Sequence, residues 1–430
     1  MKYIRFSFMV VFYLSNTVSA MSLQEAIRFS LENNPKTVAN QLRVDAMKER
    51  ASAQRMDLLP SLHLGANVQY SIDNSLASSS NGIGLSTSVN IYNGGADSYA
   101  QKSLQASLKA TDARYTSSNA YIPNTKGSIA KHVKDAYVSL IEVLEQKKYL
   151  DSLGATLQLF INANPTEDEK ILIQQRINNL STSLIRTESN LASALKDFKY
   201  FATVPAPEFD QLDSFEKVTQ SLSIPTTVEE AFQMALIKSP DLKVAAFELE
   251  AAQYDYKSEK ARLYSAKVNV NASIQRSNSA MDGSNSQLNS RSIGLSVGYI
   301  LSPSSSLRDS AAAKSVQASM RDRDGAVDEL KYDIESIYPA LETQEKLYES
   351  QLANLKSADD SLKVIIQKIK QGQKVDLKTA LSVLDSQGQY WSNCLMQQHS
   401  ILDTHFNIQR SVGILFEGLR ISEKSLSMIR

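Results

Sequence analysis

The second half of the chain repeats the first, and this duplication constrains the fold more than any other feature. The segment Ser22-Leu23-Gln24-Glu25-Ala26 recurs 205 residues later as Thr227-Val228-Glu229-Glu230-Ala231. Further on, Ile83-Gly84-Leu85-Ser86 recurs after 210 residues as Ile293-Gly294-Leu295-Ser296. Each copy predicts the same order of elements: a short helix, a proline, a helix, two strands, a very long helix and a return helix. The fold should therefore consist of two equivalent halves.

The N-terminus is typical of a secretory signal peptide. Lys2 and Arg5 supply the positive start, 6–14 is an apolar run too short to span a bilayer as a helix, and 18–20 is a small-residue cleavage site. The expected organisation is a signal peptide at 1–20, a first repeat at 21–204, a linker at 205–225, a second repeat at 226–416 and a C-terminal tail at 417–430.

Each repeat contains one predicted β-hairpin, at about 61–93 and about 266–302. Apolar residues alternate with polar or small ones, as in Leu62-His63-Leu64 and Val268-Asn269-Val270. The strands reach the ~9–11 residues that cross a bilayer at a tilt. Four strands cannot close a barrel, and an open edge in lipid costs several kcal/mol for each unpaired backbone group. Either the four strands form a soluble sheet, or several chains pool their strands.

Long heptad seams follow each hairpin. Ile334, Ile337 and Leu341 begin one seam, and about 60 residues between hairpin and turn contain almost no glycine, which corresponds to roughly 90–100 Å of helix. Pro123 and Pro339 fall inside these rods and are expected to kink them or to mark a break. Polar residues in the seams are compatible with helices packed around a water-filled channel. They are equally compatible with an ordinary antiparallel coiled coil.

Two turns are predicted at the far ends of the rods. Asn164-Pro165 lies in the first, and Gly372 begins the second. The first of these turns contains no glycine.

Several motifs in this duplicated frame resemble the outer-membrane efflux protein (TolC) family. They are Leu58-Leu59-Pro60-Ser61-Leu62 before the first strand, Ile91-Tyr92-Asn93-Gly94-Gly95 after the second strand, Val383-Leu384-Asp385-Ser386-Gln387 in the last helix, and Gly413-Ile414-Leu415 at its end. The resemblance covers the chain from Met21 to about Leu415.

The resemblance implies a mainly α fold with a β-barrel part. Four strands per chain would contribute to a trimeric twelve-stranded outer-membrane barrel, and long antiparallel coiled-coil helices would form a periplasmic α-barrel. It also implies a homotrimer in outer-membrane lipid, extending into the periplasm of a Gram-negative cell. Such a channel passively exports cargo delivered by a periplasmic adaptor and an inner-membrane pump of the ABC, RND or MFS class, in efflux or type I secretion. The helical turns would be the docking end.

The family's acidic ring near the tip corresponds to Asp385 through the Val-Leu-Asp motif. Its companion acid is Ser382 here, and Asp376 is a second candidate for acidity in that region. Three symmetry-related carboxylates in a narrow bore attract cations and resist anions. The alternative is that Asp385 is a solvated coiled-coil residue.

No feature of the sequence favours an enzyme. Gly294-Leu295-Ser296-Val297-Gly298 matches the nucleophile-elbow pattern, but its serine lies inside an alternating strand. The four histidines are scattered, and Cys394 is the only cysteine, so we expect neither a metal site nor a cofactor. Lysine plus arginine (46) balance aspartate plus glutamate (46), which gives no basic surplus for nucleic acid.

Two functions remain on the sequence alone. One is the export channel, and the other is a coiled-coil structural or adhesin protein of the cell envelope without a pore. The sequence favours the channel because an adhesin does not need paired hairpins of membrane length. It leaves the cargo (drugs, metals or secreted protein) and the pump class open.

Overall fold

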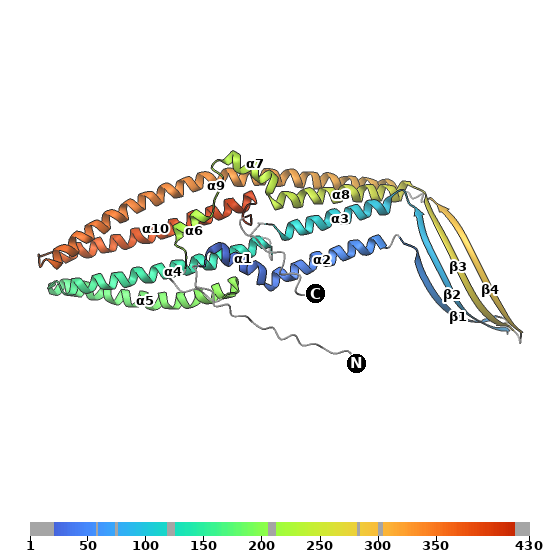
Figure 1. The fold of residues 1–430 in the computed structure, drawn as a ribbon, viewed down its shortest axis with the longest axis horizontal. Helices are drawn as coiled ribbons and strands as arrows, with labels where there is room; N and C mark the ends of the chain where they lie inside the picture. The colour runs from blue at the N-terminus through green and yellow to red at the C-terminus, as the bar shows by residue number, and fades with distance from the viewer. Residues whose placement is uncertain are drawn as a thin grey trace.

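A computed structural model describes residues 21–56, 59–73, 76–117, 125–204, 212–281, 284–299 and 304–417. The molecule is elongated, with a β-sheet at one end and two helical hairpins at the other (Figure 1). The predicted signal peptide and Pro123 lie outside the described residues, as does all of the predicted tail except Glu417. Within the described residues, no helix is long and apolar enough to cross a membrane.

The predicted order of elements is confirmed in the second repeat, whereas in the first repeat two helices, α3 and α4, take the place of the predicted single very long helix. The first repeat contains α1 (Leu23–Asn33), α2 (Pro35–Met56), β1 (Ser61–Asp73), β2 (Leu76–Tyr92), α3 (Ala96–Tyr115), α4 (Lys126–Ile161) and α5 (Glu167–Ala202). The second contains α7 (Val228–Lys238), α8 (Pro240–Tyr264), β3 (Lys267–Met281), β4 (Ser284–Gly298), α9 (Ser305–Lys370) and α10 (Leu377–Val412). Helix α6 (Phe215–Ser221) lies between the repeats, inside the segment predicted as a linker.

The repeated opening motif is a pair of capped helix starts. Ser22 caps α1 in a capping box with Glu25, and Thr227 caps α7 by accepting from the backbone N–H of Glu230. Proline then begins the next helix in both copies, at Pro35 and Pro240. The first helical position tolerates proline because its N–H would have no partner within the helix.

The four strands form one antiparallel sheet in the order β1-β2-β3-β4. The hairpins of the two repeats join through β2 and β3, with Leu85 opposite Ile274. Strands β1 and β4 are the two edges of this sheet (Figure 1).

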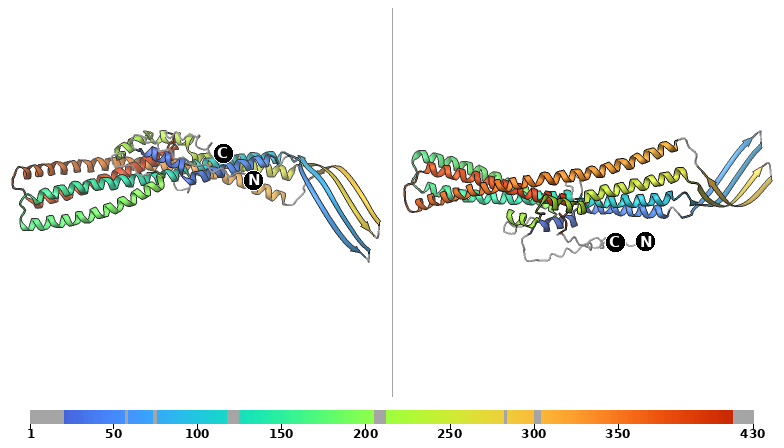
Figure 2. Two further views of the ribbon diagram at one scale, coloured as in Figure 1. Left: turned by 60° about the horizontal axis from the view of Figure 1, so that its bottom comes forward. Right: turned by 90° about the horizontal axis from the view of Figure 1, so that it is seen from above.

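Next to the sheet, α2, α3, α8 and the first part of α9 lie side by side (Figures 1 and 2). Towards the other end, α4 pairs with α5 and α9 pairs with α10. Helix α9 has 66 residues, roughly 100 Å, and continues through Pro339, so this proline marks no break. In the first repeat, α3 ends at Tyr115 and α4 starts at Lys126.

A hydrophobic core lies at mid-length, where α1 and α6 pack against the long helices (Figure 2). Phe215 and Val218 of α6 are buried in it. The Tyr137 hydroxyl donates to the backbone oxygen of Met21 (2.8 Å) and accepts from the backbone N–H of Asp213 (3.1 Å). The segment between the repeats is thus held against the first one.

Candidate functional site

One face of the sheet is apolar and exposed. Leu64 of β1, Leu85 of β2 and Ile274 of β3 are directly opposite one another in register. The neighbouring residues on the other face are polar, as in the pair Ser86 and Ser273. Large exposed apolar side chains on the first face are Leu62, Leu64, Val68, Ile83, Leu85, Ile274, Ile293, Leu295 and Val297. A strand with one apolar and one polar face fits a wall between lipid and water.

At the opposite end, the two helical turns use the same backbone conformation. Gly372 has φ +71°, and Asn164 has φ +53° at the corresponding turn of the first repeat. Asparagine adopts this left-handed conformation more readily than most residues, so it substitutes for the missing glycine.

Glu169 joins the two turns. It forms a capping box with Thr166 at the start of α5, and its Oε1 accepts from the backbone N–H of Leu377, the first residue of α10, at 3.2 Å. The hydrogen bond from the Thr166 backbone is the main cause of its lowered pKa. A residue of the first repeat therefore caps a helix of the second, which sequence reasoning missed.

Both predicted acidic residues have specific partners. Asp376 is the N-cap of α10, and the Thr379 hydroxyl (2.6 Å) and the Lys378 backbone N–H (3.0 Å) donate to it. These hydrogen bonds lower its pKa, with that from Thr379 the largest cause. Asp385 forms an ion pair with Arg176 of α5, with 2.5 Å between Oδ2 and Nη2. Whether either carboxylate lines a pore stays a prediction.

Apolar contacts dominate the packing of the α4–α5 pair against the α9–α10 pair near the turns. The Arg176–Asp385 ion pair is about half exposed, and such pairs stabilise by about 0–1 kcal/mol. Tyr149 stacks on Trp391 with ring centroids 4.4 Å apart, and buried Leu157, Ile173 and Leu381 belong to one cluster. A fully buried leucine contributes about 1.5–3 kcal/mol.

We expect Gly388→Leu to loosen this contact. A Cβ at Gly388 would lie 2.6 Å from the Tyr149 hydroxyl, so a leucine must push the ring away from Trp391. The lost aromatic pair should cost about 0.5–1.5 kcal/mol. Trp391 is the only tryptophan of the chain, so its fluorescence quenching by acrylamide should increase. Gly325→Leu on α9 is the control, because a Cβ there meets nothing within 4 Å. Equal quenching in the two variants would contradict the prediction.

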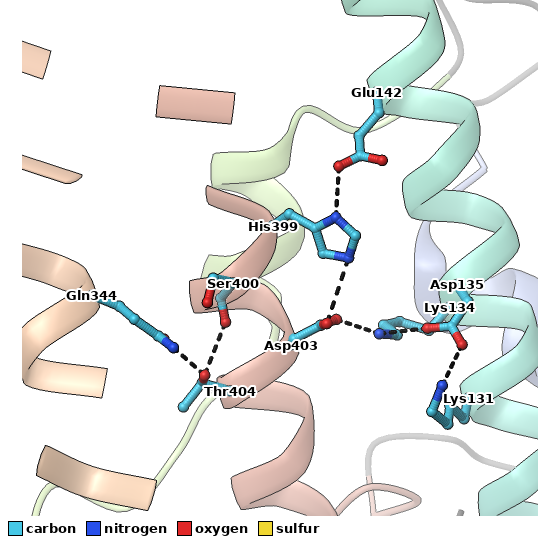
Figure 3. Close-up of polar contacts among 9 residues, drawn as sticks. All are labelled: Lys131, Lys134, Asp135, Glu142, Gln344, His399, Ser400, Asp403 and Thr404. Carbon is cyan, nitrogen blue, oxygen red and sulfur yellow. Dashed lines mark hydrogen bonds and ion pairs between the residues drawn. The ribbon is translucent and has the colours of Figure 1, made fainter. Parts of the chain in front are cut away.

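A cluster of charged residues joins α4 to α10 at mid-length (Figure 3). The Lys134 side chain is only 4% exposed and forms ion pairs with Asp135 and Asp403. His399 contacts Glu142 through Nδ1 (2.6 Å) and Asp403 through Nε2 (3.5 Å). We call these five residues the mid-length charge cluster.

The cluster shifts the pKa values of its members. Hydrogen bonds to Asp403 and then Glu142 raise the pKa of His399 to about 9. Burial alone would raise the pKa of Asp403, but the hydrogen bonds from His399 and Lys134 outweigh it and lower that pKa to about 2. Protonated His399 and ionised Asp403 are therefore the favoured forms in the folded protein. Sequence reasoning, which treated the four histidines as scattered, missed this network.

Stability should fall as pH rises through 9. The folded-state pKa of His399 lies above the ordinary 6.5, so its contribution is complete below pH 6.5 and is lost as pH passes 9. Because the imidazole is 36% exposed, we expect about 1–2 kcal/mol rather than the full value of the shift. Unfolding temperatures at pH 6, 8 and 10 measure it. His399→Gln should remove this alkaline loss, whereas His132→Gln, which changes a ring stacked on Phe201, should retain it.

The remaining candidates give no enzyme-like site. Cys394 is buried, and burial raises the pKa of its thiol. Ser296, the serine of the elbow-like motif, lies within β4 opposite Asn269. In the described part of the chain, no group of three or more His, Cys, Asp or Glu side chains is placed to hold a metal ion.

The chain matches the sequence model of one family, described as "Outer membrane efflux protein", over residues 26–153 and 231–396. The two matched segments begin at Ala26 and Ala231, which are equivalent positions in the repeats. No curated protein matches the chain.

Similar solved structures cover nearly the whole chain. The open state of the *Neisseria gonorrhoeae* MtrE outer membrane channel has a TM-score of 0.73 at 16% identity, covering 92% of this chain and 90% of that chain. The *Campylobacter jejuni* CmeC outer membrane channel has 0.69 at 14%, covering 95% and 88%. The outer membrane protein VceC from *Vibrio cholerae* has 0.68 at 14%, covering 91% and 96%. At sequence identities of 14–16%, the structural similarity to these channels establishes the fold of the chain.

Proposed function

Because the chain belongs to the outer membrane efflux protein family, we propose that three copies of it form one passive export duct through the outer membrane and across the periplasm. The resemblance drawn from the sequence motifs is confirmed. The protein is an outer-membrane efflux channel that extends into the periplasm, and it is not an enzyme. Channels of this family are homotrimers that work with adaptors and inner-membrane pumps.

The observation that carries the proposal is the sheet with an exposed apolar face and two edges. Edge strands β1 and β4 must find partners if the apolar face lies in lipid, because unpaired backbone groups there cost several kcal/mol each. Pairing β4 of one copy with β1 of the next satisfies both edges. Three copies give twelve strands, enough to enclose a channel.

The helical part continues the duct away from the membrane. Helix α9 extends from next to the sheet to the far turn, so one element connects the barrel with the tip. The turns around Asn164-Pro165 and Gly372 are the docking end for a periplasmic adaptor and an inner-membrane pump. Near this end, displacement of the α9–α10 pair changes the bore, and Asp385 and Asp376 are its acidic candidates.

Purification from outer-membrane fractions and single-channel recording test the function. We expect trimers that dissociate on heating and that conduct ions in planar bilayers. A chain that salt washing releases as a soluble, non-conducting rod would instead support the structural or adhesin function.

The cargo is tested by deletion of the protein. Gain of sensitivity to drugs or metals supports efflux by an RND or MFS pump, and selective loss of secreted proteins supports type I secretion with an ABC pump. No change in either would contradict an export role.

A further inference from the structure

On β3 and β4, the apolar series of this face ends in two arginines. On β3, the residues that share this face are Val268, Val270, Ala272 and Ile274, and the next one along is Arg276. On β4 they are Val297, Leu295 and Ile293, and the next one is Arg291. Arg291 is opposite Ile274 and Arg276 is opposite Asn289, so the two arginines are diagonal neighbours on one face. Both are exposed.

A groove of about 460 Å³ lies on this face, and Arg291 is one of its lining residues. The apolar part of its lining comprises Leu62, Leu85, Ala272, Ile274 and Ile293. The groove draws on all four strands of one chain, so each subunit carries it complete. Its mainly apolar surface suits a hydrocarbon chain.

Within the described residues of one chain, the two guanidinium groups have no anionic partner on the strands that flank them. Strands β2, β3 and β4 contain no aspartate or glutamate. Arg276 donates from Nε and Nη2 to the side-chain oxygen of Gln287, which is neutral, once that amide is oriented to present its oxygen. The site therefore has a surplus of two positive charges, which favours binding of an anion.

The place of the two arginines at the end of the apolar series on β3 and β4 corresponds to a boundary between the membrane and water. An outward-facing arginine costs about 2–4 kcal/mol at the bilayer midplane and about 0–1 near the interface. Tyr92, opposite Val268, is exposed at the other end of the apolar band, as an interfacial aromatic would be. From Val268 to Arg276 the strand rises roughly 27 Å, which a tilt of about 40° reduces to ~20 Å of height. This approaches the ~25 Å apolar band of such barrels.

We propose that Arg276 and Arg291 bind the phosphate of an anionic lipid in the outer leaflet, and that the groove holds one of its acyl chains. The inference rests on the proposed function, because it requires this face to lie in lipid. Guanidinium groups bind phosphate through paired N–H donors, and the contact is strongest where water is scarce. Each trimer then carries three such sites, and the bound lipids anchor the barrel at a fixed height in the membrane.

Native mass spectrometry of the purified trimer tests this proposal with three probes. Phosphatidic acid carries both chains and phosphate, diacylglycerol carries the same chains without phosphate, and glycerol 3-phosphate carries the phosphate without chains. We expect up to three phosphatidic acid molecules per trimer and at least tenfold weaker retention of the other two probes, because each offers only half of the recognised chemistry.

Two kinds of variant separate the parts of the site. Arg276→Gln with Arg291→Gln should reduce phosphatidic acid retention at least tenfold, while Lys267→Gln, on the other face of β3, should leave it unchanged. Ala272→Phe fills the groove and should weaken retention although both arginines remain.

Equal retention of diacylglycerol, or equal retention by the double variant and the unchanged protein, would overturn the proposal. Retention of glycerol 3-phosphate as strong as that of the lipid would overturn the acyl groove. Trimer formation and conductance are measured on the same samples, so loss of the lipid site is distinguished from failure of the channel itself.

Discussion

Leu295→Arg should prevent recovery of trimers from the outer membrane, whereas Ser296→Arg should not. Leu295 is at the centre of the apolar series on β4 and is 67% exposed in the single chain. Its neighbour Ser296 lies on the polar face, opposite Asn269. An arginine in the lipid-facing position costs about 2–4 kcal/mol per subunit at the midplane, and therefore about 6–12 kcal/mol per trimer.

The measurement is the amount of trimer in purified outer membranes, with the two variants expressed at equal level. The two positions differ by one residue, so they share chain entropy, strand propensity and added charge. The face of the sheet is the only large difference between them. Ser296→Arg adds three positive charges inside the barrel and should lower cation conductance without lowering trimer yield. Loss of both variants, or of neither, would contradict the assignment of the faces.

The sequence was sufficient to predict the elements because their signals are local. Alternation along Leu62-His63-Leu64 and heptads around Ile334 need only neighbouring residues, and the hairpins at about 61–93 and 266–302 contain the observed strands. The repeat supplied each prediction twice. Helix α6 was missed because it is seven residues long in a polar context. Its buried Phe215 and Val218 belong to a core built mainly from first-repeat residues, which no local pattern indicates.

Contacts at the candidate sites were less predictable. The motif around Asp385 drew attention to that residue, but its partner Arg176 lies 209 positions away on another helix. His399 and Asp403 are four residues apart and face each other on α10, so half of that network was readable from the helical period. The other half, Lys134 and Glu142, comes from α4 and depends on how the two repeats pack.

Lys134→Met should destabilise the folded protein by about 2–4 kcal/mol per subunit, the largest loss we expect from one side chain in the helical part. Methionine has nearly the same length and keeps the packing of the stem. It removes the ammonium that pairs with Asp135 and Asp403 and lies 5.5 Å from the Phe406 ring centroid. Asp403 then keeps His399 as its only cationic partner, and the Asp403 side chain is about 60% buried. The expected loss is below the 3–5 kcal/mol typical of a fully buried pair, because the Asp403 side chain is partly exposed.

Unfolding of the purified trimer in denaturant at pH 7 measures the loss, and a double variant identifies its cause. If the Asp403 carboxylate, left with His399 alone, is responsible, Lys134→Met combined with Asp403→Asn should recover part of the lost stability, because the weakly compensated charge is removed. Lys131→Met is the matched control: Lys131 also pairs with Asp135, at 2.5 Å, but its side chain is 40% exposed, so the expected cost is about 0–1 kcal/mol. Equal losses for Lys131→Met and Lys134→Met would mean that burial of the Lys134 charge does not set the strength of the connection between α4 and α10.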